Sequence, residues 1–229
     1  MDLKHFLVQS DTVGQVLFGL LISMSMASWF FIVLKAWRNR LSSHRSGQFL
    51  QCFWNAASLD DVAQSLHQHP SNEPFAHLTY HAITAVRHHA AHGAHRLHEA
   101  GTATEFLTRA IRRVIDEETT KLEWGLTALA SIASTAPFVG LFGTVWGVYH
   151  ALIGIGKNGQ GTLDQIAGPV GEALIMTGLG LAVAIPAVLA YNDCSRNNRL
   201  VLARLDAFAH DLFAFLTTGA IVPTQSGEQ

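Results

Sequence analysis

The chain has 229 residues and a formal charge of −2, from 15 Lys and Arg against 17 Asp and Glu, which excludes a basic nucleic-acid-binding protein. Only 14% of its residues are charged, where soluble domains carry about 25%, and 49% are apolar, so the composition indicates a membrane protein. Two cysteines are too few for a disulfide-rich fold or a four-cysteine zinc site.

The first predicted element is a membrane-spanning helix at 12–34, an uncharged run that follows a short N-terminal segment at 1–11. About 20 apolar residues are enough to cross the hydrocarbon layer as a helix. The run is too long for a signal-peptide core and has no small-residue cleavage site before its basic flank, so we expect it to be retained.

A polar segment at 35–123 follows, and it carries too many charges to lie in lipid. Its composition, dominated by Ala, Leu, Glu, Arg and His, predicts helices. One of them is predicted from Thr104 to Leu122, continuing toward the next span without a break. Its apolar residues recur at helical spacing. They are Phe106, Leu107, Ala110, Ile111 and Val114.

The second uncharged run, 124–156, is predicted to span the membrane as well. Its only ionisable side chain is that of His150, which we interpret as an interfacial polar residue. A helix of about 33 residues is longer than a bilayer is thick, so we expect it to protrude into water or to end early, near Gly154. A short Gly-rich loop at 157–164 joins it to the next element.

The third apolar run, 165–192, is predicted to be the third span, and its one charged residue is Glu172. The remaining segment, 193–229, is predicted to form a cytoplasmic helix and a frayed tail. Its apolar residues fall on one helix face, which requires a partner helix. They are Val201, Leu205, Phe208, Leu212 and Phe215. The predicted fold class is all-α, with three transmembrane helices and long cytoplasmic helical extensions.

Lys and Arg accumulate on the cytoplasmic side of membrane spans, and they predict the orientation here. They follow the first run, precede the second and follow the third. All three runs therefore agree on an extracytoplasmic N-terminus and a cytoplasmic C-terminus.

Glu172 leaves two interpretations open. An acidic side chain at bilayer depth costs about 2.5–3.5 kcal/mol on insertion scales, so such residues usually mark an ion or proton path. Alternatively, the helix could begin at Gly168 and Pro169, and Glu172 in its first turn would then interact favourably with the positive end of the helix dipole. The continuous apolar run from Ile166 and the abundance of small residues favour the buried position.

Other candidate pore residues are small, hydroxyl-bearing or proline. The glycines at three- and four-residue steps predict either a close helix–helix contact or a water-filled interior. The prolines predict helix kinks or backbone carbonyls without a helical hydrogen-bond donor. The hydroxyl of each candidate Thr either relays protons or donates a hydrogen bond to the backbone carbonyl four residues earlier in its own helix. The residues are Gly140, Gly143, Gly147, Thr144, Thr177, Pro137 and Pro186.

Histidines in the polar segment raise the possibility of a metal site, because they recur at three- and four-residue steps. The residues concerned are His77, His81, His88, His92, His95 and His98. No carboxylate or Cys joins them in a recognised motif, so we interpret them as a solvated helix face and expect neither metal nor cofactor. The absence of GxSxG, HExxH and phosphate-binding GKS or GKT sequences supports no enzyme class.

Two stretches carry a specific resemblance: APFVGLFGTVWGV at 136–148 and AGPVGEALIMTGLGLAVAIPAVLAYN at 167–192. They resemble the ExbB/TolQ/MotA family of proton-channel subunits, and most closely its ExbB branch. The resemblance extends into the first span through ASWFFIVLKAW, whereas 35–123 is similar only in length and helical character.

The resemblance implies an inner-membrane protein that assembles as a homopentamer around the spanning helices of two ExbD subunits. Proton flow would drive a motion that TonB carries to outer-membrane transporters for iron-siderophores and vitamin B12. It implies that Glu172 is the essential carboxyl, that Thr144 and Thr177 face the pore, and that an Asp of ExbD exchanges the proton.

Two alternatives remain at this point. The short N-terminal segment resembles the TolQ branch, which serves the Tol-Pal envelope system with the same chemistry. A non-conducting membrane scaffold, in which Glu172 only caps a helix, is the other.

Overall fold

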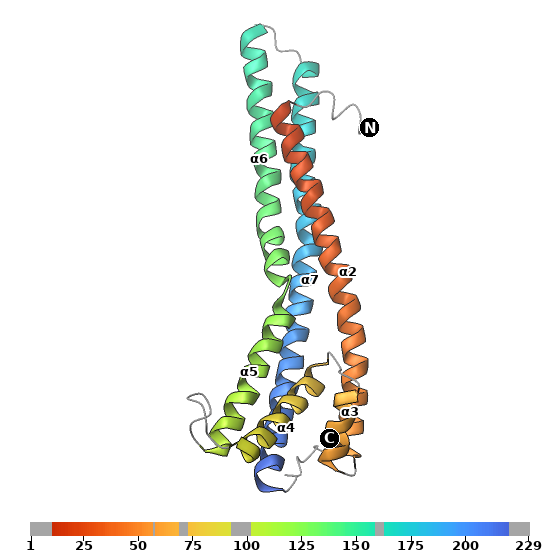
Figure 1. Ribbon diagram of the computed structural model, residues 1–229. Helices are drawn as coiled ribbons and strands as arrows, with labels where there is room; N and C mark the ends of the chain where they lie inside the picture. The colour runs from red at the N-terminus through yellow and green to blue at the C-terminus, as the bar shows by residue number, and fades with distance from the viewer. Residues whose placement is uncertain (1–10, 57, 69–72, 93–101, 159–162, 220–229) are drawn as a thin grey trace, which may run out of the picture. The chain divides into compact units, whose positions relative to one another are not determined.

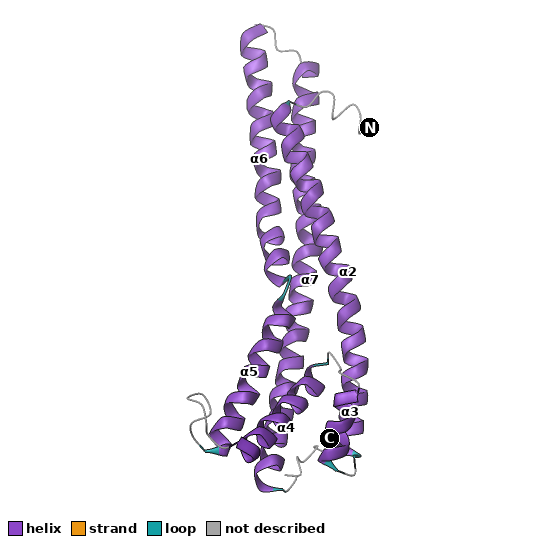
Figure 2. Ribbon diagram, viewed as in Figure 1, coloured by secondary structure: helices purple, strands orange, loops and turns teal. Residues whose placement is uncertain are grey.

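The computed structural model describes residues 11–56, 58–68, 73–92, 102–158 and 163–219. Every regular element within these ranges is a helix (Figure 2). The helices are α2 (Thr12–Trp54), α3 (Leu59–Gln68), α4 (Pro74–His92), α5 (Ala103–Glu123), α6 (Leu126–Asn158) and α7 (Leu163–Thr218). The all-α prediction is confirmed.

Three helical stretches of the described chain are long and apolar enough to cross a membrane. They are Thr12–Trp54, Ala103–Gly154 and Ala167–Thr218. Each of the three uncharged runs of the sequence lies largely within one of them, so the prediction of three membrane-spanning helices is confirmed.

The chain divides into two compact units. The first comprises 1–36 and 125–195, and the second 37–124 and 196–229. The helices α2 and α7 each contribute residues to both units, whereas α6 belongs to the first, and α3, α4 and α5 belong to the second.

The core of the first unit forms where α2, α6 and α7 lie side by side (Figure 1). Leu21 of α2 and Leu129 and Ala136 of α6 are almost completely buried there, together with Ala187 of α7. Lipid tails are as apolar as these side chains, so such a contact depends on close van der Waals packing rather than on exclusion of water.

Glycines allow α6 and α7 to approach each other closely. A Cβ on Gly140 of α6 would lie 2.7 Å from the carbonyl oxygen of Met176, and one on Gly180 of α7 would lie 2.7 Å from that of Ala136. Real Cβ atoms essentially never come this close to another heavy atom. The two backbones therefore contact each other directly at this level.

Aromatic and aliphatic side chains form the core of the second unit. Phe208 of α7 is at its centre, with its ring centroid 5.2 Å from that of Phe53 and 5.5 Å from that of Phe75. The residues of the two predicted stripes that are buried in this core are Leu107, Ile111, Val114, Leu205, Phe208 and Leu212. They are the central members of the two predicted apolar stripes, which are thereby confirmed.

The expectation that one helix passes unbroken from the polar segment into the second span is wrong. The helix α5 ends at Glu123 and α6 begins at Leu126. Between them Gly125 has a φ of +79°, a conformation that side chains disfavour, and a Cβ there would lie 2.9 Å from the ring of Phe31. Two residues, Trp124 and Gly125, therefore separate the two helices.

The expectation of an early end near Gly154 is also wrong, because α6 continues to Asn158. Its 33 residues extend about 50 Å at 1.5 Å per residue, which exceeds the roughly 30 Å of the hydrocarbon layer. The other expectation for this run, a helix that protrudes into water, is consistent with this length.

Candidate functional site

Glu172 is the tenth residue of α7 and is half-buried. Orphan backbone N–H groups, which interact with a first-turn carboxylate, occur only in the first four residues of a helix. Because α7 begins at Leu163 and continues through Pro169, the helix-cap interpretation of Glu172 is wrong.

Glu172 lines a cavity of about 500 Å³ within the first unit. The walls come from α6, α7 and the start of α2. Its titratable side chains are those of Asp11, His150 and Glu172, and the other residues are Gly14, Gly143, Trp146, Gly147, Ala151, Gly154, Gly168, Pro169, Ala173 and Met176. Small residues predominate, so the space between the helices is left open rather than filled by side chains.

Two threonine hydroxyls meet between α6 and α7. The hydroxyls of Thr144 and Thr177 are in hydrogen-bonding contact with each other. Thr144 Oγ1 lies 3.2 Å from the carbonyl oxygen of Gly140 and 3.3 Å from that of Ala173, and Thr177 Oγ1 lies 3.4 Å from the Gly140 oxygen. The i−4 bond weighed for Thr144 is present, but the same hydroxyl also reaches across to α7. Ala173 directly follows Glu172 in the chain, but neither Thr144 nor Thr177 is among the residues that line the cavity.

The other candidate pore residues lie along the same helix pair. Gly143 and Gly147 line the cavity, and added Cβ atoms would meet Met176 at 3.0 Å and Ala173 at 2.8 Å. Of the two candidate prolines, Pro137 is inside α6 and Pro186 is inside α7. Since proline has no N–H, each leaves the carbonyl four residues earlier without its helical donor.

Asp11 and Trp146 were missed by reasoning from the sequence. Asp11 Oδ2 accepts a hydrogen bond from Trp146 Nε1 at 3.4 Å and lies 3.6 Å from His150 Nε2. Its Oδ1 accepts from the backbone N–H of Thr12, the first residue of α2, at 2.8 Å. An Asp directly before an uncharged helical run is a recognisable N-cap signal, but no spacing links it to residues 135 or more positions later.

A buried acidic cluster lies in the second unit. Glu73 caps α4 through its Oε2, which accepts from the N–H of Ala76 at 2.9 Å, while its Oε1 accepts from Ser46 Oγ at 2.6 Å. Burial raises the pKa of Glu73 above its ordinary value. Glu118 of α5 is equally buried, and its Oε1 lies 2.6 Å from Lys121 Nζ.

The histidines of α4 do not form one solvated face. Nδ1 of the half-buried His77 lies 2.8 Å from Glu118 Oε1, so the solvated-face interpretation is wrong for this residue. His81 and His88 are exposed, in agreement with it, and partial desolvation of the ring lowers the pKa of His81. Within the described ranges no three His, Cys, Asp or Glu side chains are grouped to hold a metal. His95 and His98 lie outside those ranges.

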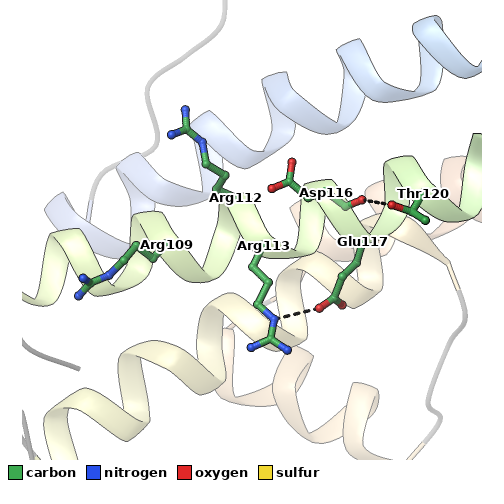
Figure 3. A pocket seen from close by; sticks show the side chains of 6 residues that line it. All are labelled: Arg109, Arg112, Arg113, Asp116, Glu117 and Thr120. Atoms are coloured by element: carbon green, nitrogen blue, oxygen red, sulfur yellow. Dashed lines mark hydrogen bonds and ion pairs between the residues drawn. The ribbon is translucent and has the colours of Figure 1, made fainter. Parts of the chain in front are cut away.

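A second pocket lies on α5 in the second unit (Figure 3). It is lined by Arg109, Arg112, Arg113, Asp116, Glu117 and Thr120, all from this one helix. Nε of Arg113 donates to Oε1 of Glu117 at 3.0 Å, four residues along the same face. Because the lining charges are of both signs and lie on an exposed surface, the cavity around Glu172 is the stronger candidate site.

Residues 72–207 match the sequence pattern of the MotA/TolQ/ExbB proton channel family. This chain belongs to that family. The matched range contains Glu172, Thr144 and Thr177, and it excludes Asp11 and the whole of α2. The resemblance seen in the two apolar stretches is confirmed.

Curated relatives extend the similarity over nearly the whole chain. The biopolymer transport protein ExbB of Xanthomonas campestris pv. campestris (strain B100) is 44% identical over 230 residues, covering 97% of this chain and 91% of the relative. The ExbB protein of Neisseria meningitidis serogroup A is 39% identical, covering 93% and 96%. The Tol-Pal system protein TolQ of Pseudomonas aeruginosa is 31% identical, covering 90% and 89%.

Proposed function

We propose that this protein is an ExbB-type proton-channel subunit of the bacterial inner membrane. With ExbD it uses the proton-motive force to energise TonB-dependent outer-membrane transport of iron-siderophores and vitamin B12. The observation that carries the proposal is a carboxylate, Glu172, well inside an apolar helix and open to a cavity between α6 and α7. The ExbB relatives at 39–44% identity support this branch of the family.

In the proposed mechanism Glu172 takes up and releases the proton. A proton that crosses 100 mV releases about 2.3 kcal/mol, so one transfer biases only a modest conformational change, and repeated transfers accumulate work. The hydroxyls of Thr144 and Thr177 act as donors and acceptors between α6 and α7, because each can rotate to either role. An acidic side chain of ExbD is the partner that exchanges the proton.

The proposed topology follows the basic flanks of the spans. Residues 1–11 are extracytoplasmic, 12–34, 124–156 and 165–192 cross the membrane, and 157–164 form the periplasmic loop. The segments 35–123 and 193–229 are cytoplasmic.

A homopentamer is part of the proposal. Large apolar side chains of α6 and α7 are exposed on the isolated chain, including Phe138, Phe142, Leu174 and Leu189. In a membrane such faces are covered by lipid or by other copies of the chain. The mass of the detergent-purified complex, measured by light scattering, tests the copy number.

The decisive variant is Glu172→Gln, because Gln keeps the size of the side chain and removes its titration. We expect loss of TonB-dependent uptake of radiolabelled vitamin B12 at unchanged membrane abundance and unchanged association with ExbD. Glu123→Gln, the same substitution at an exposed position outside the cavity and outside the three spans, serves as the control. Full uptake by Glu172→Gln would contradict the proposed mechanism and favour the scaffold.

TolQ remains the second candidate, because the Pseudomonas aeruginosa TolQ protein is similar over 90% of this chain. Its chemistry is the same, so variants of Glu172 do not separate the two. Neighbouring genes do: exbD and tonB accompany the first function, and tolR and tolA the second.

A further inference from the structure

Two titratable side chains of the Glu172 cavity have no role in the function proposed above. They are Asp11, at the start of α2, and His150, on α6. We propose that Asp11 and His150 form a proton-relay pair at the outer end of the cavity, through which protons reach Glu172. This inference rests on the proposed function and on the proposed topology.

The pair is held by named contacts. His150 Nε2 lies 3.6 Å from Asp11 Oδ2, and Trp146 Nε1 donates to the same oxygen at 3.4 Å. The rings of Trp146 and His150 are 4.6 Å apart between centroids, since the two residues are neighbours on one face of α6. The second oxygen of Asp11 is fixed by the N–H of Thr12. Both members therefore have defined positions rather than free side chains.

Exposure distinguishes the mouth of the cavity from its interior. The side chains of His150 and Asp11 are 44% and 50% exposed, whereas Glu172 is half-buried. Solvent therefore reaches the pair more readily than it reaches Glu172. Within the described residues, no other Asp, Glu, His, Lys or Arg lines this cavity.

The packing of α6 on α7 brings the pair within about one helical turn of Glu172 along the helix axes. An added Cβ on Gly147 would lie 2.8 Å from the Cβ of Ala173, so these two residues are at the same level. Glu172 adjoins Ala173, and His150 is three residues beyond Gly147, or about 4.5 Å along α6. One or two waters in the cavity are enough to connect side chains offset by about one turn.

Only proton transfers are required. A proton from outside water binds the imidazole of His150, and the Asp11 carboxylate stabilises the positive ring. The ring then releases a proton through cavity water to the carboxylate of Glu172 and becomes neutral again. Imidazole is suited to this step because its charge changes between about pH 5 and 8.

The test compares His150→Gln and Asp11→Asn with Tyr149→Phe. Tyr149 is exposed, its ring lies 5.6 Å from that of His150, and it does not line the cavity. Uptake of radiolabelled vitamin B12 is measured between external pH 6 and 8, relative to wild type at each pH and at equal membrane abundance. Cells supply ExbD, TonB and the receptor.

We expect both relay variants to transport about tenfold more slowly at pH 8, below the roughly 10²–10⁴-fold that a positioned proton-transfer group contributes, because water in an open cavity substitutes in part. The deficit should shrink at pH 6, where outside protons are more abundant. The double variant should lose no more than either single one, because the two residues act as a unit. Tyr149→Phe should match wild type.

Two other results overturn the inference. Wild-type uptake by both relay variants at pH 8, while Glu172→Gln is inactive, would leave the proposed function intact and eliminate the relay. Equal, additive deficits at all pH values would assign Asp11 and His150 to packing alone. An active Glu172→Gln variant would instead remove the proposed function itself.

Discussion

The glycine contact between α6 and α7 gives the sharpest stability prediction. In Gly140→Ala the new Cβ would lie 2.7 Å from the Met176 oxygen, and 3.1 Å from the Cα atoms of Gly180 and Thr177. An ordinary contact begins at 3.4 Å, so the helices must separate by about 0.7 Å, the difference between these two distances. All three of these atoms belong to the backbone, so no side-chain rotation relieves the clash.

The magnitude follows from this displacement. A gap of about 0.5–1 Å removes a quarter to a half of each affected van der Waals contact, and overpacking of this kind typically costs about 1–3 kcal/mol. The higher helix propensity of Ala offsets about 0.8–1 kcal/mol in water. We therefore expect Gly140→Ala to lower the free energy of unfolding by up to about 2 kcal/mol.

Gly178→Ala is the matched control, because a Cβ on Gly178 meets nothing within 4 Å. It should leave stability unchanged or raise it by up to about 1 kcal/mol. Thermal unfolding of the detergent-purified protein, followed by circular dichroism, measures both, and about 2–4 °C per kcal/mol is expected for a chain of this size. Equal melting temperatures for the two variants would refute the argument from close approach.

Three further predictions concern other parts of the chain. Phe208→Ala should destabilise the second unit by about 3–5 kcal/mol, because it removes the ring that contacts Phe53 and Phe75; chemical denaturation measures this, and an unchanged midpoint would contradict it. Burial raises the pKa of Glu73, so its contribution favours the folded state most below pH 4.5 and is lost as the pH rises through the raised value. Glu73→Gln should therefore flatten the decline in stability between pH 4 and 8, and a slope identical to wild type would argue against this assignment. Cys52 and Cys194 should both escape a membrane-impermeant thiol reagent in intact cells and react after permeabilisation, whereas labelling of Cys194 from outside would overturn the proposed topology.

Periodic features of the fold were predictable from the sequence because each depends on residues close together in the chain. The three spans follow from uncharged length alone. The stripes containing Leu107 on α5 and Leu205 on α7 follow from helical spacing, which puts them on the face that needs a partner. Periodicity could not identify the partner of each face. In the structure the two stripes share one core with each other and with the rings of Phe53 and Phe75.

Local exceptions were not predictable in the same way. The break at Gly125 depends on the sign of one φ angle, in a sequence whose neighbours all favour helix. The contact of Asp11 with Trp146, and that of His77 with Glu118, join residues far apart in sequence. For Glu172, spacing alone left the cap and the buried position open, and the start of α7 at Leu163 excludes the cap.

The direct backbone contact between α6 and α7 restricts how these helices can move. Sliding α6 along α7 by four residues, about one turn, would bring Ala136 or Thr144 to the level where Gly140 now faces Met176, and a Cβ there would lie 2.7 Å from the Met176 oxygen. The cross-helix bonds of Thr144 would have to break as well. Shear between the two helices is therefore blocked, whereas rotation of the pair as one rigid hairpin leaves every one of these contacts in place.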